Sequence, residues 1–297
     1  MGETLKLSRS QKSWRALALF IGLFAAAAGV SYSALGFLVD ARPRVIGAAP
    51  DDLDVEAIEL RDAQGRKVGA WFVDAGPGSD SVLLMHGKDG CRLANVARAR
   101  FLGDAGYSCL LIDLQAHGES EGEFISFGVH EAASAHAAVL HLRSIRPERR
   151  VVAFGTSLGA AACLLGDDIV DADVFVLESL YPTIEEALDN RLRKKLGPFA
   201  VIAAPLLMMQ MGPRFDLSAS QLRPIERLPL VDVPVFVISG AEDTRTTAAE
   251  TERLFAAANS PKELWLVPGV GHQDLHRHAG AEYEQRLLAF LAEHLAD

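Results

Sequence analysis

The stretch that most constrains the fold is a serine between two glycines, Gly155-Thr156-Ser157-Leu158-Gly159. An apolar, β-branched run precedes it at residues 151–154, and small residues with good helix propensity follow it. The pattern predicts a buried strand that turns sharply into a helix, with the serine in a strained backbone conformation at the turn. A serine placed there stands at a helix N-terminus, where free backbone N–H groups can receive negative charge. The alternative is a helix N-cap serine whose glycines serve only the turn.

A serine hydroxyl becomes a strong nucleophile only when a base takes its proton, and that base needs an orienting partner. Asp243 follows a predicted strand in the sequence Ser-Gly-Ala-Glu-Asp, and His272 follows the last predicted strand in Pro-Gly-Val-Gly-His. Because both come after strands, we expect them at the same sheet edge as Ser157. The chain order Ser, Asp, His is typical of one arrangement of a catalytic triad.

Neighbouring residues compete for these roles. Glu242 and Glu178 are alternatives to Asp243 as the acid, and His276 and His278 are alternatives to His272 as the base. Three further residues in loops after strands are interpreted as structural: His86, His117 and Asp113, the last as a hydrogen-bond acceptor that fixes its loop.

Strands and helices alternate along residues 55–297. The strands are expected at residues 55–60, 67–73, 81–85, 107–112, 151–154, 172–177, 233–239 and 262–267. Helices are expected at residues 91–105, after Leu158, at residues 128–145 and at residues 282–295. This order predicts an α/β fold with a mostly parallel eight-stranded sheet flanked by helices.

The connection at about residues 180–230 is too long for a simple crossover, and we expect a small helical cap there. It contains a basic run at residues 190–195 and an apolar run at residues 199–211. The hypothesis is that Met208, Met209 and Met211 line an adaptable pocket for an acyl chain. The alternatives are a cap helix packed on the core with a solvated basic end, and a stretch that dips into a membrane surface.

The N-terminal region predicts a membrane anchor. Residues 1–15 are basic, and residues 16–39 give 24 positions without a formal charge. A helix of that length spans roughly 36 Å, enough for a hydrocarbon core of about 30 Å. The excess of basic residues before the span predicts a single-pass protein of the cell membrane with a cytoplasmic N-terminus and an extracytoplasmic body. The alternative is a cleaved secretory signal. Residues 40–54 are expected to form a linker.

Composition narrows the classes of partner. The net charge is −10, and the basic N-terminal region leaves residues 45–297 at −14. Such an acidic body disfavours nucleic-acid binding. The three cysteines, Cys91, Cys109 and Cys163, have no metal-site spacing, and we expect no bound metal.

Five short motifs together resemble the α/β-hydrolase-fold serine hydrolases over about residues 55–297. They are His86-Gly87, Asp113-x-x-x-His117-Gly118-x-Ser120, Gly155-x-Ser157-x-Gly159, Gly240-x-x-Asp243 and Gly271-His272. Within that fold the chain is most similar to membrane-anchored esterases and thioesterases of the Bem46-like type. It departs from the usual pattern at Gln115 and Ala116, where Arg and Gly are common, and at Lys88.

The resemblance implies hydrolysis of an ester or thioester through an acyl-enzyme. Ser157 attacks the carbonyl, His272 takes its proton, and Asp243 orients the imidazole. The oxyanion is expected at the backbone N–H groups of Leu158 and Lys88. The substrate is expected to be a small or lipid-like acyl compound, and no cofactor is needed. A peptidase or amidase, or a non-catalytic membrane-tethered binding module, are the alternatives.

Overall fold

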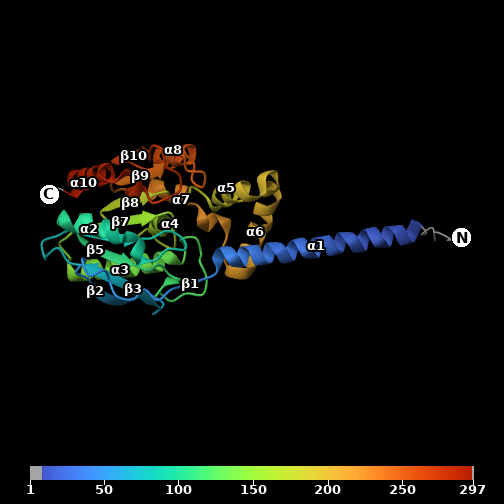
Figure 1. The fold of residues 1–297 in the computed structure, drawn as a ribbon, viewed down its shortest axis with the longest axis horizontal. Helices are drawn as coiled ribbons and strands as arrows, with labels where there is room; N and C mark the ends of the chain where they lie inside the picture. The colour runs from blue at the N-terminus through green and yellow to red at the C-terminus, as the bar shows by residue number, and fades with distance from the viewer. Residues whose placement is uncertain (1–8, 296–297) are drawn as a thin grey trace.

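The computed structural model describes residues 9–295. Its centre is an eight-stranded sheet in the order β10-β9-β8-β7-β4-β5-β3-β2 (Figure 1). The strands from β10 to β5 are parallel, whereas β3 is antiparallel to β5 and β2 is antiparallel to β3. The strands are β2 (Glu56–Arg61), β3 (Lys67–Val73), β4 (Ser81–Met85), β5 (Ser108–Ile112), β7 (Val151–Thr156), β8 (Val174–Glu178), β9 (Val235–Gly240) and β10 (Lys262–Val267). The predicted mostly parallel eight-stranded sheet is therefore confirmed, with starts up to two residues later than expected.

Helices cover both faces of the sheet, because alternate side chains of each buried strand point to opposite layers. Val151 and Ala153 of β7 pack in one core with α3 and α4, and Val152 and Phe154 pack in the other with α2 and α10. The helices of the body are η1 (Arg92–Asn95), α2 (Val96–Asp104), α3 (Glu131–Ile145), α4 (Leu158–Leu164), α8 (Ala248–Ala257), α9 (Leu275–Ala279) and α10 (Ala281–Leu295).

The expected helical cap lies between β8 and β9. It consists of α5 (Ile184–Leu196), η2 (Gly197–Phe199), α6 (Ala200–Phe215), η3 (Ala219–Leu222), α7 (Pro224–Arg227) and η4 (Leu228–Leu230). Thr183 caps α5 by accepting a hydrogen bond from the N–H of Glu186. Gly197, with φ 56°, ends α5 and turns the chain into the apolar helix α6.

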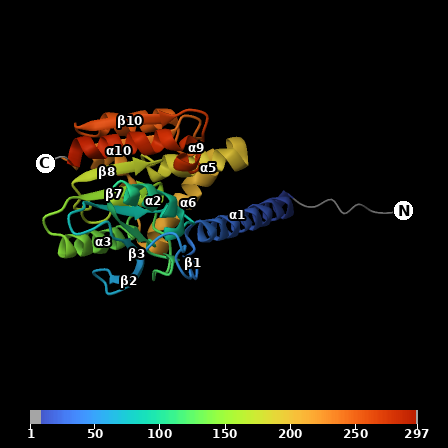
Figure 2. The same cartoon turned by 60° about the vertical axis from the view of Figure 1, so that its left-hand side comes forward.

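Helix α1 (Arg9–Val39) projects away from the body and meets it only near its C-terminal end (Figures 1 and 2). There Leu35 and Val39 are buried in the same core as the sheet. Two hydrogen bonds join α1 to α6. Gln210 Nε2 donates to Ser31 Oγ at 2.6 Å, and the Arg214 guanidinium donates to the Tyr32 carbonyl at 2.8 Å. The C-terminal part of the predicted span at residues 16–39, from Ser31 to Val39, thus contacts protein.

Among the described residues, one stretch is long and apolar enough to qualify as a membrane-crossing helix, and it is Ile184–Phe215 in the cap. It is divided by the turn at Gly197. Within α1 the same criteria find a shorter apolar helix, Ala28–Val39. The N-terminal anchor therefore stays a prediction, and residues 1–8 of the predicted basic segment lie outside the described residues.

The segment expected to be a linker is fixed to the body at its start. Strand β1 (Arg42–Pro43) pairs in parallel with β6 (His117–Gly118). The N–H of Arg42 donates to the Ala116 carbonyl at 2.6 Å, and the N–H of Arg44 donates to the Gly118 carbonyl at 2.8 Å. The chain leaving α1 is thus bonded to the loop that follows β5.

Candidate active site

Ser157 occupies the sharp turn between β7 and α4, with φ 52° and ψ −102°. A non-glycine residue with positive φ is strained, and such strain is concentrated at functional sites. Both flanking glycines are required for space. A Cβ on Gly155 would lie 2.3 Å from the N of Ala160, and one on Gly159 would lie 2.7 Å from the Met85 carbonyl oxygen. Ser157 is the N-cap residue of α4 by position, but its side chain makes no capping hydrogen bond, so the hydroxyl does not serve as a helix cap.

Asp243 and His272 meet across the loops that follow β9 and β10. His272 Nδ1 lies 2.7 Å from Asp243 Oδ2. Because an ionised carboxylate only accepts, Nδ1–H donates and leaves Nε2 of the neutral ring as an acceptor for a proton. Asp243 also accepts from the N–H of Arg245 at 2.7 Å and from the N–H and hydroxyl of Thr246 at 3.1 and 2.8 Å.

These contacts keep Asp243 ionised although its side chain is buried. Burial raises the pKa of the carboxyl, but the hydrogen bond from His272, the charge of that ring when it is protonated, and the N–H groups of Arg245 and Thr246 outweigh burial and lower it. A charged Asp243 can therefore hold the His272 ring in one tautomer and stabilise it when it becomes an imidazolium.

Ser157 and His272 line one small cavity at the carboxyl end of the parallel strands. The Ser157 hydroxyl has no hydrogen-bond partner among the side chains and backbone that the structure describes. One wall of the cavity is apolar, formed by Phe127, Leu158, Tyr181, Ile184, Ala187 and Leu188. The three predicted triad residues thus come from three strand ends to one place.

The competing acids and bases are engaged elsewhere. Glu178 is fully buried and accepts from Arg98 Nη2 at 3.0 Å and from the Tyr283 hydroxyl at 2.7 Å. His276 Nε2 is paired with Glu284 at 2.8 Å, and His278 Nε2 with the Pro268 carbonyl at 3.1 Å. Glu242 is exposed, whereas its neighbour Asp243 holds the imidazole.

Two backbone N–H groups beside Ser157 are available to an oxyanion. Those of Leu158 and Lys88 have no acceptor among the described residues, and both residues line the cavity. The loop after β4 lies against the turn, since a Cβ on Gly87 would be 3.7 Å from the Cβ of Ser157. Free backbone N–H groups beside a nucleophile are what stabilisation of a tetrahedral oxyanion requires.

A model of the alpha/beta hydrolase family matches residues 82–286, which is more than half of the chain and includes Ser157, Asp243 and His272. The chain belongs to the alpha/beta hydrolase family. It is 29% identical to the uncharacterised protein Rv2307c of Mycobacterium tuberculosis over 253 residues, covering 84% of this chain and 83% of that protein. It is 24% identical to the uncharacterised protein YqkD of Bacillus subtilis over 249 residues, covering 81% and 80%.

Among solved structures, the chain resembles the esterase Pf2001 of Pyrococcus furiosus, with a TM-score of 0.70 and 22% identity, covering 87% of this chain and 99% of that one. At this identity the likeness concerns the fold. The comparison therefore groups this member of the alpha/beta hydrolase family with solved structures that share its fold.

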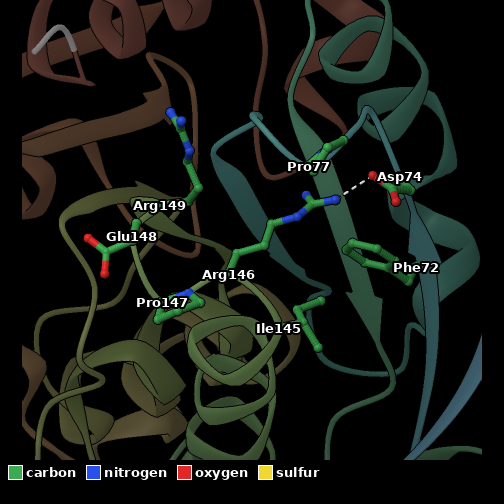
Figure 3. A pocket seen from close by; sticks show the side chains of 8 residues that line it. All are labelled: Phe72, Asp74, Pro77, Ile145, Arg146, Pro147, Glu148 and Arg149. Atoms are coloured by element: carbon green, nitrogen blue, oxygen red, sulfur yellow. Dashed lines mark hydrogen bonds and ion pairs between the residues drawn. The ribbon is translucent and has the colours of Figure 1, made fainter.

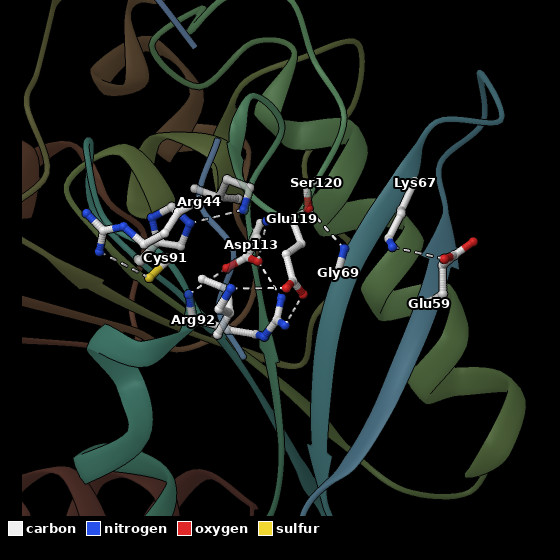
Figure 4. Close-up of polar contacts among 12 residues, drawn as sticks. Arg44, Glu59, Lys67, Gly69, Cys91, Arg92, Asp113, Glu119 and Ser120 are labelled. Atoms are coloured by element: carbon white, nitrogen blue, oxygen red, sulfur yellow. Dashed lines mark hydrogen bonds and ion pairs between the residues drawn. The ribbon is translucent and has the colours of Figure 1, made fainter. Parts of the chain in front are cut away.

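The Asp113 loop of this alpha/beta hydrolase is a buried polar network (Figure 4). Asp113 accepts from the N–H of Arg92 at 2.7 Å and of Glu119 at 2.9 Å, and it forms an ion pair with the Arg92 guanidinium. A Cβ on Gly118, where φ is 53°, would lie 2.3 Å from the Asp113 carboxylate. These contacts agree with the prediction that Asp113 fixes its loop as a hydrogen-bond acceptor.

His86 and His117 use both ring nitrogens in fixing loops. His86 Nδ1 lies 2.8 Å from the Gly87 carbonyl, and its Nε2 accepts from the N–H of Leu114 at 3.1 Å. His117 Nδ1 lies 2.9 Å from the Gln115 carbonyl, and its Nε2 accepts from the N–H of Asp89 at 3.3 Å. Burial lowers the pKa of each ring to about 4. Both rings are therefore neutral structural groups.

The three methionines proposed for the acyl pocket do not line the cavity beside Ser157. Met211 is buried in the core, Met208 packs at its edge, and Met209 is 73% exposed on the outer side of α6. The prediction of a methionine-lined pocket was wrong because it assigned the wrong cap helix to the cavity. Helix α5, not α6, lies over the cavity and contributes Ile184, Ala187 and Leu188 to it.

Sequence reasoning missed the apolar wall of the cavity and both of its arginines, Arg191 and Arg245. Arg191 belongs to the basic run at residues 190–195, a pattern that is also typical of a solvated helix end. Arg245 follows Asp243 by two positions, and that spacing is the signal that could have found it.

Another cavity lies at the opposite end of the sheet, before β4 and β7 (Figure 3). Its central charge, Arg146, is already paired with Asp74 and donates to Ser79 Oγ at 2.8 Å. It lies away from Ser157, and its charged centre is satisfied within the protein.

Proposed function

We propose that this member of the alpha/beta hydrolase family is a serine hydrolase that cleaves carboxylic ester or thioester bonds. One observation carries the proposal. The Nδ1 of His272 is bonded to Asp243 at 2.7 Å, and the ring shares a cavity with Ser157 at its strained turn. The structurally similar P. furiosus protein is an esterase, which adds support for ester chemistry.

In the proposed reaction the Ser157 oxygen attacks the acyl carbonyl carbon while His272 Nε2 takes the hydroxyl proton. The N–H groups of Leu158 and Lys88 receive the oxyanion. His272 then protonates the leaving alcohol or thiol, whose bond to the carbonyl carbon breaks. Water, deprotonated by His272, attacks the acyl-enzyme and releases the acid and Ser157. The apolar wall formed by α5 and Tyr181 is suited to the acyl chain.

The test uses the full chain purified in detergent with a fluorophosphonate probe and short-chain p-nitrophenyl esters and thioesters. We expect labelling and turnover in the wild-type chain, and loss of both in a folded Ser157→Ala variant. Ser179→Ala, at another buried strand-end serine with positive φ, is the matched control for folding effects. An unreactive folded wild-type chain would favour the binding-module alternative.

We also propose that α1 tethers the protein to the cell membrane as a single pass with a cytoplasmic N-terminus. Exposed apolar side chains along α1 support a lipid-facing helix, among them Leu17, Leu19, Ile21 and Val30. Helix α6 bonds to α1 and presents its own exposed apolar side chains, Val201, Ile202 and Met209, which suit the same membrane. A C-terminal reporter that is active only outside the cytoplasm tests the orientation. Activity is expected, and an inactive reporter together with activity of a second C-terminal reporter that works only in the cytoplasm would reverse the proposed orientation.

A further inference from the structure

Two pockets adjoin at Ser157, and the more polar of them contains the carboxylates of Asp89, Glu178 and Asp274. The same three basic side chains line both pockets. They are Lys88 after β4, Arg191 on α5 and Arg245 after β9. Three separate elements thus bring positive charge to the nucleophile in a chain whose net charge is −10. A basic site within an acidic body concentrates positive potential where a substrate would bind.

Lys88 already has an ion-pair partner, which it shares with Arg42. Its Nζ lies 2.8 Å from Asp89 Oδ1, and the same oxygen accepts from Arg42 Nε at 2.9 Å. In the polar pocket Arg98 is paired as well, with Glu178 at 3.0 Å and with Asp274 at 3.1 Å.

Arg191 and Arg245 differ from these cations. Neither guanidinium has an ion-pair partner or a hydrogen-bond acceptor within the part of the chain that the structure describes. The next arginine along α5 provides the contrast, since Arg193 is exposed and bonds to Asp189 at 2.5 Å. A guanidinium has five donors and no acceptor, so two unpaired guanidiniums at one cavity require acceptors from outside the chain.

Arg245 is exposed, but the setting of Arg191 makes its charge costly without an anion. Arg191 is half-buried. Burial and the positive charge of Arg245 lower the pKa of Arg191, and Asp89 offsets this only in part. An anionic group between the two side chains would relieve their mutual repulsion and accept several charge-assisted hydrogen bonds.

We propose that the substrate carries an anionic group, a carboxylate or a phosphate, that Arg191 and Arg245 bind while Ser157 attacks the acyl carbonyl. The inference rests on the proposed function. Arg191 and Arg245 act as specificity-determining residues, and the apolar wall receives the acyl chain. The favoured substrates are thus acyl esters or thioesters that are charged on one side of the scissile bond.

Two matched substrate pairs distinguish the position of the anion. Mono-p-nitrophenyl glutarate against p-nitrophenyl hexanoate places a carboxylate on the acyl side. Monooleoyl glycerol phosphate against monooleoylglycerol places a phosphate on the alcohol side. For each pair the measured quantity is the ratio of kcat/KM for the anionic ester to that for the neutral ester, in the full chain at low salt.

We expect the Arg191→Gln/Arg245→Gln double variant to lower this ratio about tenfold or more in at least one pair. The Arg191→Lys/Arg245→Lys variant should keep most of it, because the charge remains. Arg193→Gln is the matched control on the same helix and should keep the ratio within about twofold, as expected for an exposed ion pair. Ratios unchanged by the glutamine variants in both pairs would overturn the inference while leaving the hydrolase proposal intact.

A binding measurement keeps the two proposals separate. The full-length Ser157→Ala variant is titrated calorimetrically with glutarate and with inorganic phosphate. Saturable heat that disappears in the Arg191→Gln/Arg245→Gln background supports the anion site even if no ester is cleaved. Absence of heat with both anions contradicts it.

Discussion

Gly240 lies so close to Val270 that a Cβ at residue 240 would be 2.3 Å from the Val270 carbonyl oxygen. The loop that carries Asp243 and the loop that carries His272 therefore touch through their backbones. Their hydrogen bond depends on this contact, because any side chain at residue 240 would separate the loops.

We expect Gly240→Ala to lower esterase activity at least tenfold and to destabilise the fold by about 1–3 kcal/mol, as overpacking does. Turnover of a p-nitrophenyl ester and urea denaturation would measure the two effects. Gly78→Ala is the control, since a Cβ there would meet nothing within 4 Å. Equal behaviour of the two variants would show that the loops can move apart at no cost.

Replacing Asp243 by Asn should lower kcat by about 10³–10⁴-fold with little loss of stability, because the amide can favour the wrong tautomer of His272. Glu242→Gln, one residue away and exposed, should retain activity. Steady-state kinetics on both variants decide between the two acids. A larger loss in Glu242→Gln would assign the role to Glu242.

The buried ion pair of Arg92 with Asp113 provides a stability prediction. Arg92→Gln leaves a fully buried carboxylate without its cation, at a cost of about 3–5 kcal/mol. Burial already raises the pKa of Asp113, so the loss should shrink at acidic pH, where the carboxyl can be neutral. Urea unfolding at two pH values measures this. Arg61→Gln, in an exposed pair with Glu59, should leave the urea midpoint nearly unchanged at both pH values.

His86 and His117 should make the protein sensitive to mild acid. Burial lowers their pKa from 6.5 to about 4, so the unfolded chain binds more protons between these values. The free energy of unfolding is therefore highest, with respect to these two groups, above about pH 6.5, and it decreases as the pH falls toward 4. For His86 the loss is on the order of 3 kcal/mol. Urea midpoints from pH 7 to pH 4.5 would show it.

A His86→Gln variant provides the comparison. It is less stable at pH 7, but its stability should fall less steeply between pH 7 and pH 4.5 than that of the wild-type chain. Parallel pH dependences for the two proteins would contradict the assignment of this acid sensitivity to His86.

Much of the fold and site could be predicted from the sequence, for local reasons. The small residues around Ser157 permit only a tight turn, and Asp243 and His272 follow strands whose ends must meet at one edge. The identity of the cap helix over the cavity could not be predicted. Both α5 and α6 lie in one connection, and their amphipathic patterns do not say which of them faces Ser157.

The N-terminal helix illustrates a second limit. An apolar residue such as Leu35 is equally compatible with a membrane-spanning helix and with a protein core. Only its tertiary contacts show that it is buried in the body. The unpaired state of Arg191 was similarly hidden, because a run of basic residues does not reveal which members lack carboxylates nearby.

The pairing of β1 with β6 has a practical consequence for anyone who wants a water-soluble enzyme. Trimming the chain at residue 45 would delete the strand that supports the Ala116–Gly118 turn, and with it Arg42, which shares Asp89 with Lys88. The shortened protein would have an altered loop beside Ser157. Its kinetic constants would therefore differ from those of the full-length protein.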